Sequence, residues 1–214
     1  MARTYDAARL GTAVPRLNVA HVRDLVIPTP PLSEQRQIVA EIEKQFTRLV
    51  VGGFVSYAWR WKIFRGWLVP FPDLNGTWQG SIQTTWTNPE TGAIPAPIPV
   101  VLTIKQACTR SSCVMRTAEM TSRSYLADFW LDGDEQVRML GYSYHSKPSP
   151  SVVERSQPHD GTIIFELIND PVEKLKGTYW TARKTTGEVI LTFREDKRLD
   201  EFPPDSGKHP VSGK

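Results

Sequence analysis

The chain contains 214 residues, of which 40% are hydrophobic and 23% are charged, and its formal net charge is +3. This length allows one large or two small domains, and the apolar content is sufficient for a hydrophobic core. The small basic excess is compatible with anionic partners, but it excludes a polybasic nucleic-acid-binding protein.

The N-terminal part of the chain predicts one helix after an irregular segment. Prolines interrupt residues 1–31, so no long element is expected there. Ser33 is suited to cap a helix, and apolar residues then recur at helical spacing up to Leu49. Gly52 and Gly53 are expected to weaken or end this helix.

Residues 49–69 form an aromatic and basic connector. Its apolar stretch, "LVVGGFVSYAW", has about eleven residues, whereas a membrane-spanning helix needs about 20. No complete transmembrane helix is therefore expected. Tryptophans then alternate with Arg60, Lys62 and Arg65. This pattern fits a contact of residues 50–67 with a membrane surface, and it fits equally a short helix from Trp59 to Val69 that packs on a folded domain.

Residues 11–48 resemble a fragment of a known family. The stretches "GTAVPRLN" and "VRDLVIPTPPLSEQRQIVAEIEKQFTRL" are similar to the end of a target-recognition domain in the type I restriction specificity subunit. The remainder of such a domain and its partner helix are missing from this sequence. We therefore interpret residues 1–48 as an acquired fragment and expect no DNA binding.

From Leu74 onward the pattern changes to short β-strands separated by turn signals. The expected strands are residues 74–87, 98–108, 113–122, 124–131, 136–145, 160–168, 175–184 and 187–194. Short turns without intervening helices predict an all-β fold, an eight-stranded antiparallel barrel over residues 70–196 with an N-terminal helical appendage. Residues 197–214 have no apolar period and are expected to be a disordered tail.

The stretch "GTYWTARKTTG" leaves two orientations open. If Tyr179, Thr181 and Arg183 face the interior, the barrel contains an arginine that requires an anion such as phosphate. If Trp180 and Ala182 face the interior, the same strand contributes only to an apolar core.

Several blocks in the strand region resemble one family in order: "FPDLNGTWQGSI", "VVLTIKQ", "TAEMTSRSYLADF", "MLGYSYHSKP", "HDGTIIFEL" and "LKGTYWTARKTTGEVILTFR". They are similar to the β-barrel domain of the two-transmembrane effectors in bacterial CBASS anti-phage defence. The resemblance implies a lipocalin-like barrel that receives a cyclic dinucleotide, and assembly in the inner membrane after binding. Where that family carries two membrane helices, this sequence has the restriction-subunit-like segment and then residues 50–67, which we interpret as a remnant of the second helix and its juxtamembrane end.

The resemblance favours the orientation in which Tyr179, Thr181 and Arg183 face the interior, and it implies that they contact the cyclic dinucleotide. Arg183 is the expected phosphate partner, with hydroxyl support from Thr181 and Tyr179. Arg123 is the weaker second cation. Aromatic faces for the bases are expected from Tyr144, Tyr179 and Trp78, although Trp78 is favoured as a core residue.

The function expected from this resemblance is a cyclic-dinucleotide receptor or effector of CBASS that forms homo-oligomers on ligand binding. The chain would lie in the bacterial cytoplasm or on the cytoplasmic face of the inner membrane. No catalytic motif is found and the histidines share no metal-ligand spacing, so we expect no enzyme, no metal and no cofactor. Two alternatives remain, a restriction-system accessory protein acting through the N-terminal helix and a carrier of an apolar ligand with Trp180 in its cavity.

Overall fold

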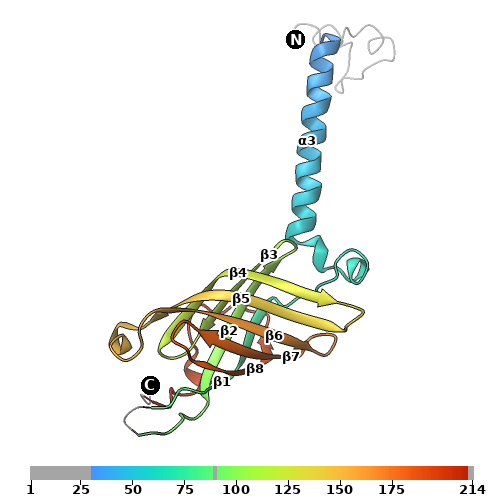
Figure 1. The fold of residues 1–214 in the computed structure, drawn as a ribbon. Coiled ribbons are helices and arrows are strands. Elements are labelled where there is room, and N and C mark those ends of the chain that lie inside the picture. The colour runs from blue at the N-terminus through green and yellow to red at the C-terminus, as the bar shows by residue number, and fades with distance from the viewer. Residues whose placement is uncertain (1–29, 89–90, 212–214) are drawn as a thin grey trace, which may run out of the picture. The chain divides into compact units, whose positions relative to one another are not determined.

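A computed structural model describes residues 30–88 and 91–211 (Figure 1). Residues up to Leu49 and residues from Val50 onward form two separate compact units. Helix α3 spans Leu32–Ser56, and none of its residues is buried. The predicted start of the helix is confirmed within one residue. The predicted end is too early, because a glycine costs about 1 kcal/mol in a helix without removing a backbone hydrogen bond.

The connector after the helix contains two short 3₁₀ turns, η1 at Ala58–Arg60 and η2 at Lys62–Phe64. The continuous helix expected from Trp59 to Val69 does not form. Trp59 is buried and packs on Phe71, with ring centroids 5.5 Å apart, and Phe71 stacks on Phe129 of the barrel at 5.6 Å. The connector is therefore attached to the barrel through aromatic contacts. Within the described ranges, no helix has the length and apolar character needed to cross a membrane.

Eight antiparallel strands close into a barrel in which each strand pairs with its sequence neighbour and β8 pairs with β1 (Figure 1). The strands are β1 (Gly76–Thr84), β2 (Ile98–Ala107), β3 (Arg110–Arg116), β4 (Met120–Asp132), β5 (Val137–Pro148), β6 (His159–Ile168), β7 (Lys174–Thr181) and β8 (Thr186–Glu195). The predicted eight-stranded antiparallel barrel is confirmed. The more specific likeness to lipocalins stays a prediction.

Among the strand boundaries that differ from the sequence prediction, two affect the predicted site residues. The third and fourth strands are separated at residues 117–119, where the Thr117 hydroxyl accepts hydrogen bonds from the backbone N–H groups of Glu119 and Met120. A threonine turn of this kind has no glycine or proline to mark it. Consequently Arg123 lies inside β4 instead of between two strands. The seventh strand ends at Thr181, which places Arg183 in the following turn.

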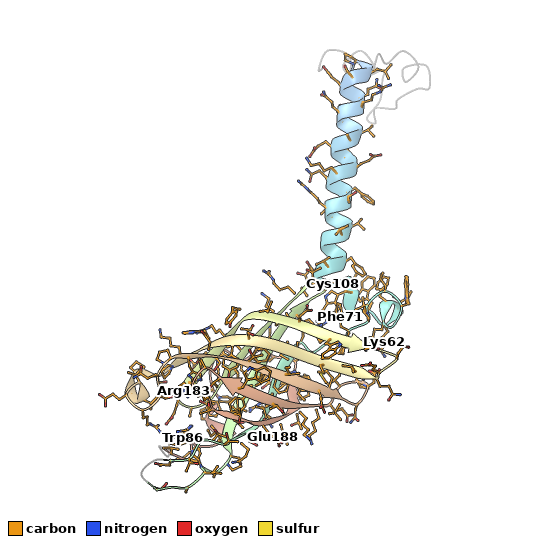
Figure 2. All side chains as sticks on the ribbon, viewed as in Figure 1. Lys62, Phe71, Trp86, Cys108, Arg183 and Glu188 are labelled. Atoms are coloured by element: carbon orange, nitrogen blue, oxygen red, sulfur yellow. The ribbon has the colours of Figure 1, made fainter. Side chains whose placement is uncertain are left out.

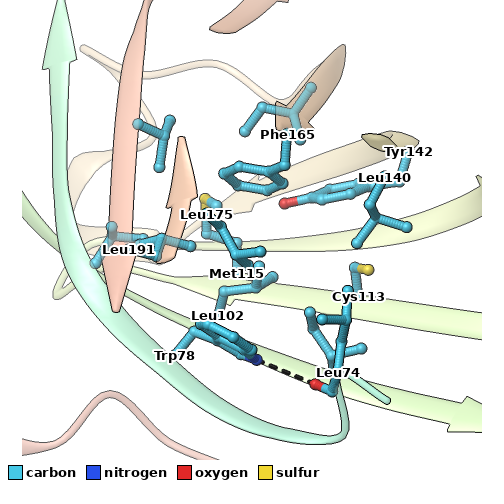
Figure 3. Packing of buried hydrophobic residues seen from close by; sticks show 14 of the residues in the cluster. Leu74, Trp78, Leu102, Cys113, Met115, Leu140, Tyr142, Phe165, Leu175 and Leu191 are labelled. Carbon is cyan, nitrogen blue, oxygen red and sulfur yellow. Dashed lines mark hydrogen bonds between the residues drawn. The ribbon is translucent and has the colours of Figure 1, made fainter. Parts of the chain in front are cut away.

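One end of the barrel is closed by the segment that precedes β1. Leu74 and Trp78 are fully buried, and the Trp78 indole N–H donates a hydrogen bond of 3.0 Å to the Leu74 carbonyl (Figure 3). The buried Gln106 side chain accepts from the Leu74 N–H at 2.8 Å and donates to the Pro72 carbonyl at 2.9 Å. These bonds satisfy the polar groups of the segment, so it can lie in the apolar interior at low cost.

The C-terminal segment does not follow the sequence expectation of disorder over residues 197–211, and residues 212–214 of that expectation lie outside the described residues. Its described part, residues 196–211, lies along the outer wall of the barrel. The Thr77 and Thr103 hydroxyls donate to the carbonyls of Lys197 and Leu199 at 2.5 and 3.0 Å. The segment has little apolar periodicity because polar contacts, which no hydrophobic pattern reveals, hold it in place.

We expect the unit from Val50 onward to keep its stability without the first 48 residues. Helix α3 buries none of its side chains, so its removal takes away little packing. A chain that starts at residue 49 should unfold in urea with a free energy within about 0.5 kcal/mol of the full chain. Loss of the β-sheet signal in circular dichroism after this deletion would contradict the division.

Candidate ligand-binding site

A cavity of about 540 Å³ opens at the end of the barrel opposite the closed end. Figure 2 shows Arg183 and Trp86 at this end, away from Phe71 and Cys108 at the other. Inward-facing residues of the strands line its inner part, and the rim comes from the loop after β1, the β3–β4 turn, the loop between β5 and β6, the β7–β8 turn and the C-terminal segment. Five separate parts of the sequence therefore form one mouth.

Two tyrosines form much of the inner wall, and glycines make room for them. A Cβ at Gly161 would lie 2.5 Å from the Tyr144 hydroxyl, and a Cβ at Gly187 would lie 2.7 Å from the Tyr179 ring. Burial raises the pKa of Tyr144 to about 12 and also raises the pKa of Tyr179, while the charge of Arg183 acts in the opposite direction on both. Both hydroxyls therefore stay protonated and can donate hydrogen bonds at neutral pH.

The orientation of β7 is now defined. Tyr179 and Thr181 are 8% and 9% exposed and line the cavity, whereas Trp180 is 44% exposed on the outer face. The alternative with Trp180 in the interior is therefore wrong. The Thr181 hydroxyl lies 2.7 Å from the Thr185 hydroxyl across the turn, so two hydroxyl groups stand together at the rim.

Arg183 lines the cavity from the β7–β8 turn and not from the strand. Its side chain is exposed, and its guanidinium donates to the Ser156 hydroxyl at 3.3 Å. Partial burial lowers the pKa of Arg183, and the two tyrosines raise it. The guanidinium remains charged and stands at the rim, where it can reach an anion at little desolvation cost.

Two of the residues predicted for the site lie elsewhere. Arg123 pairs in register with Val114 and is exposed on the outer wall, while its neighbour Ser122 lines the cavity. Trp78 is 1% exposed and belongs to the core at the closed end (Figure 3). Arg123 faces outward because the preceding turn lies four to six residues earlier than predicted, which sets the alternation of β4.

Three charged or titratable residues at the mouth were missed by the sequence analysis. Glu119 is 6% exposed, and its carboxylate is ion-paired with Arg155 from the β5–β6 loop. The His209 Nδ1 lies 3.5 Å from the other carboxylate oxygen. Burial lowers the pKa of His209, with Glu119 acting in the opposite direction. The three residues lie on separate loops, so no local sequence pattern connects them.

The arrangement is that of a binding site. Aromatic faces, hydroxyl donors and the Arg183 guanidinium point into one cavity, a combination suited to a ligand with planar rings and anionic groups. Among the residues that the structure describes, no group of three or more histidine, cysteine or acidic side chains is placed to hold a metal ion.

Comparison with known proteins agrees with a ligand-binding barrel. Residues 69–193 match the family described as Cap15, cyclic dinucleotide receptor domain. The chain is also 28% identical over 139 residues to the CD-NTase-associated protein 15 of Staphylococcus schleiferi, an alignment that covers 65% of this chain and 70% of the relative. The resemblance of residues 11–48 to a restriction specificity subunit stays a prediction. Because the family match covers more than half of the sequence and includes all eight strands except the last residues of β8, this chain belongs to the Cap15 cyclic dinucleotide receptor domain family.

Proposed function

We propose that the barrel binds a cyclic dinucleotide in the cavity at its open end and acts as a receptor in CBASS anti-phage defence. The observation that carries this proposal is the cavity itself, where Tyr144, Tyr179 and Arg183 meet within a domain of this family. Its volume of about 540 Å³ lies within the range of roughly 300–1,000 Å³ that small-molecule sites occupy.

Each group has a role in this proposal. The Arg183 fork contacts a bridging phosphate with two N–H groups, and of the mutually hydrogen-bonded hydroxyls of Thr181 and Thr185 the one with a free O–H donates to the same anion. The rings of Tyr144 and Tyr179 offer faces or hydroxyl groups to the bases. Arg155 is a better second cation than Arg123 in this proposal, because Arg155 lines the cavity.

We propose that the protein responds to the bound ligand by self-association. Ligand binding would favour a homo-oligomer, and the role is that of a receptor and effector instead of an enzyme. The chain would work in the bacterial cytoplasm or at the cytoplasmic face of the inner membrane.

Residues 1–48 would be an acquired fragment without a DNA-binding role. The carrier alternative loses its main support, because the tryptophan on which it depended lies outside the cavity.

The connector supports a contact with a membrane surface. Trp61, Ile63 and Trp67 are 61%, 69% and 70% exposed, and Lys62 and Arg65 are exposed beside them. The sequence contains no acidic residue between Lys44 and Pro72. Exposed indoles next to cations are typical of segments that lie in the interface of an anionic bilayer.

A cyclic dinucleotide should stabilise the folded protein. The gain is about 2.7 kcal/mol when the free ligand is at a hundredfold excess over its dissociation constant. A thermal-shift screen with cyclic di-AMP, cyclic di-GMP, cyclic di-UMP and mixed cyclic dinucleotides measures it, with the linear dinucleotides as controls. The absence of a shift with every member of the panel would contradict the receptor function.

The two arginines predicted from sequence should differ in effect. Arg183→Ala should weaken binding of the best cyclic dinucleotide by about tenfold or more, because a charged phosphate contact is lost. Arg123→Ala, which removes the same side chain from the outer wall, should leave the affinity unchanged. Both variants should melt near the wild-type temperature because both side chains are exposed. Calorimetric titration decides between the two residues, and equal affinities would place the phosphate elsewhere.

The connector should bind vesicles that contain phosphatidylglycerol. Replacing both Trp61 and Trp67 by alanine should reduce co-sedimentation about fivefold or more, since two interfacial anchors are lost. Trp130→Ala is the matched control, because Trp130 is 60% exposed on β4, outside the connector. An equal loss in both variants would show a nonspecific apolar contact and would argue against a defined membrane surface.

A further inference from the structure

The C-terminal segment, residues 196–211, follows the part of the chain that matches the receptor family, which ends at residue 193. We call this segment the strap. Its first half is bound to the outer wall: the Leu199 carbonyl accepts from the Thr103 hydroxyl at 3.0 Å and from the Arg116 guanidinium at 3.1 Å. The contact site moves from Thr77, at the start of β1, toward β3. Lys197 and Leu199 therefore contact β1, β2 and β3 at the level of the paired residues Thr77 and Thr103.

Burial of the wall agrees with this path. Val101 and Thr103 lie on β2 between residues that face the core, so alternation places both on the outer face. They are nevertheless 0% and 8% exposed. A side chain on the outer face of a barrel is normally exposed to solvent. Thr103 is buried because the strap lies over it and accepts its hydroxyl hydrogen bond at Leu199. This packing identifies the strap as a docked part of the fold.

A second anchor holds the strap on β8, near the point where the end of β8 pairs with the start of β1. Arg194, on β8, donates to the Asp205 carboxylate at 2.8 Å and to the Ser206 hydroxyl at 3.2 Å. Gly207 then passes close to Pro99 at the start of β2, where an added Cβ would lie 3.1 Å from the proline ring. These contacts direct the last described residues into the opening of the cavity.

At the mouth the strap contributes to the cavity wall. His209 and Val211 both line the cavity. The His209 side chain is 10% exposed and lies against Glu119, whose carboxylate is already paired with Arg155. Glu119 and Arg155 belong to the β3–β4 turn and to the β5–β6 loop. The end of the strap thus joins two other loops of the mouth, and its position depends on this three-residue contact.

We propose that the strap completes the ligand-binding site and that His209 and Val211 act as a latch, a wall against which the bound nucleotide packs. This inference rests on the proposed receptor function. The latch buries ligand surface that the family domain alone would leave exposed. The ligand then leaves only when the latch lifts from Glu119. The main effect of the latch is therefore on the dissociation rate of the complex.

The test removes the latch and keeps the anchors. A chain that ends at Ser206 retains the contacts of Lys197, Leu199 and Asp205 but lacks both latch residues. The probe is the cyclic dinucleotide that gives the largest thermal shift with the wild-type protein. Without the latch its dissociation, followed by stopped-flow displacement, should be about tenfold faster, with a matching loss of affinity. His209→Ala should give a smaller change in the same direction, and the exposed neighbour Lys208→Ala should give none.

The possible outcomes separate the two proposals. Suppose that the wild-type protein binds the probe, and that the chain ending at Ser206 and His209→Ala release it at the wild-type rate. This result overturns the latch and leaves the receptor function intact. No binding of any panel member to the wild-type protein overturns the receptor function and the latch with it. If the shortened chain melts below the wild-type protein without ligand, His209→Ala decides alone, because a single exchange at the mouth leaves the anchors in place.

Discussion

The close contact between β1 and β8 is the constraint on which the remaining structure depends. A Cβ at Gly80 would lie 1.9 Å from the Ile190 carbonyl oxygen, and a Cβ at Gly187 would lie 2.2 Å from the Gln83 carbonyl oxygen. No side chain fits at either position, so these glycines allow the last strand to pair with the first. Pairing removes both sheet edges. It also creates an interior with two ends, and the difference between these ends provides the site.

The two ends differ in what fills them. At the closed end, Trp78 and Leu74 occupy the interior, and Gln106 satisfies the backbone that enters with them. At the open end, hydroxylated residues such as Ser146 and Thr181 line a cavity together with aliphatic ones such as Ile82, and Tyr144 and Tyr179 stand along the wall. Apolar packing therefore provides stability at one end, which leaves the other end free to hold a polar ligand. The loops and the strap then decide how far that ligand is enclosed.

The candidate site was only partly predictable from sequence. Tyr179 and Thr181 were expected to share a face because alternation along a strand is a local property, and the structure places both in the cavity. Arg123 was misplaced because a turn without glycine or proline shifted the start of its strand. Glu119, Arg155 and His209 could not be connected, since their contact forms only after three distant loops meet at one end of the barrel.

The sequence by itself determined the number of strands, their antiparallel order and the change of architecture near Pro70, because strand periodicity and turn signals are encoded over a few residues. It also determined a likeness to one receptor family. Only the tertiary structure decided which end of the barrel is open, that Arg183 stands on a turn at the rim, and that residues 196–211 dock on the wall. These features depend on contacts between residues far apart in the chain, such as Thr103 with Leu199, and such contacts leave no periodic signal in the sequence.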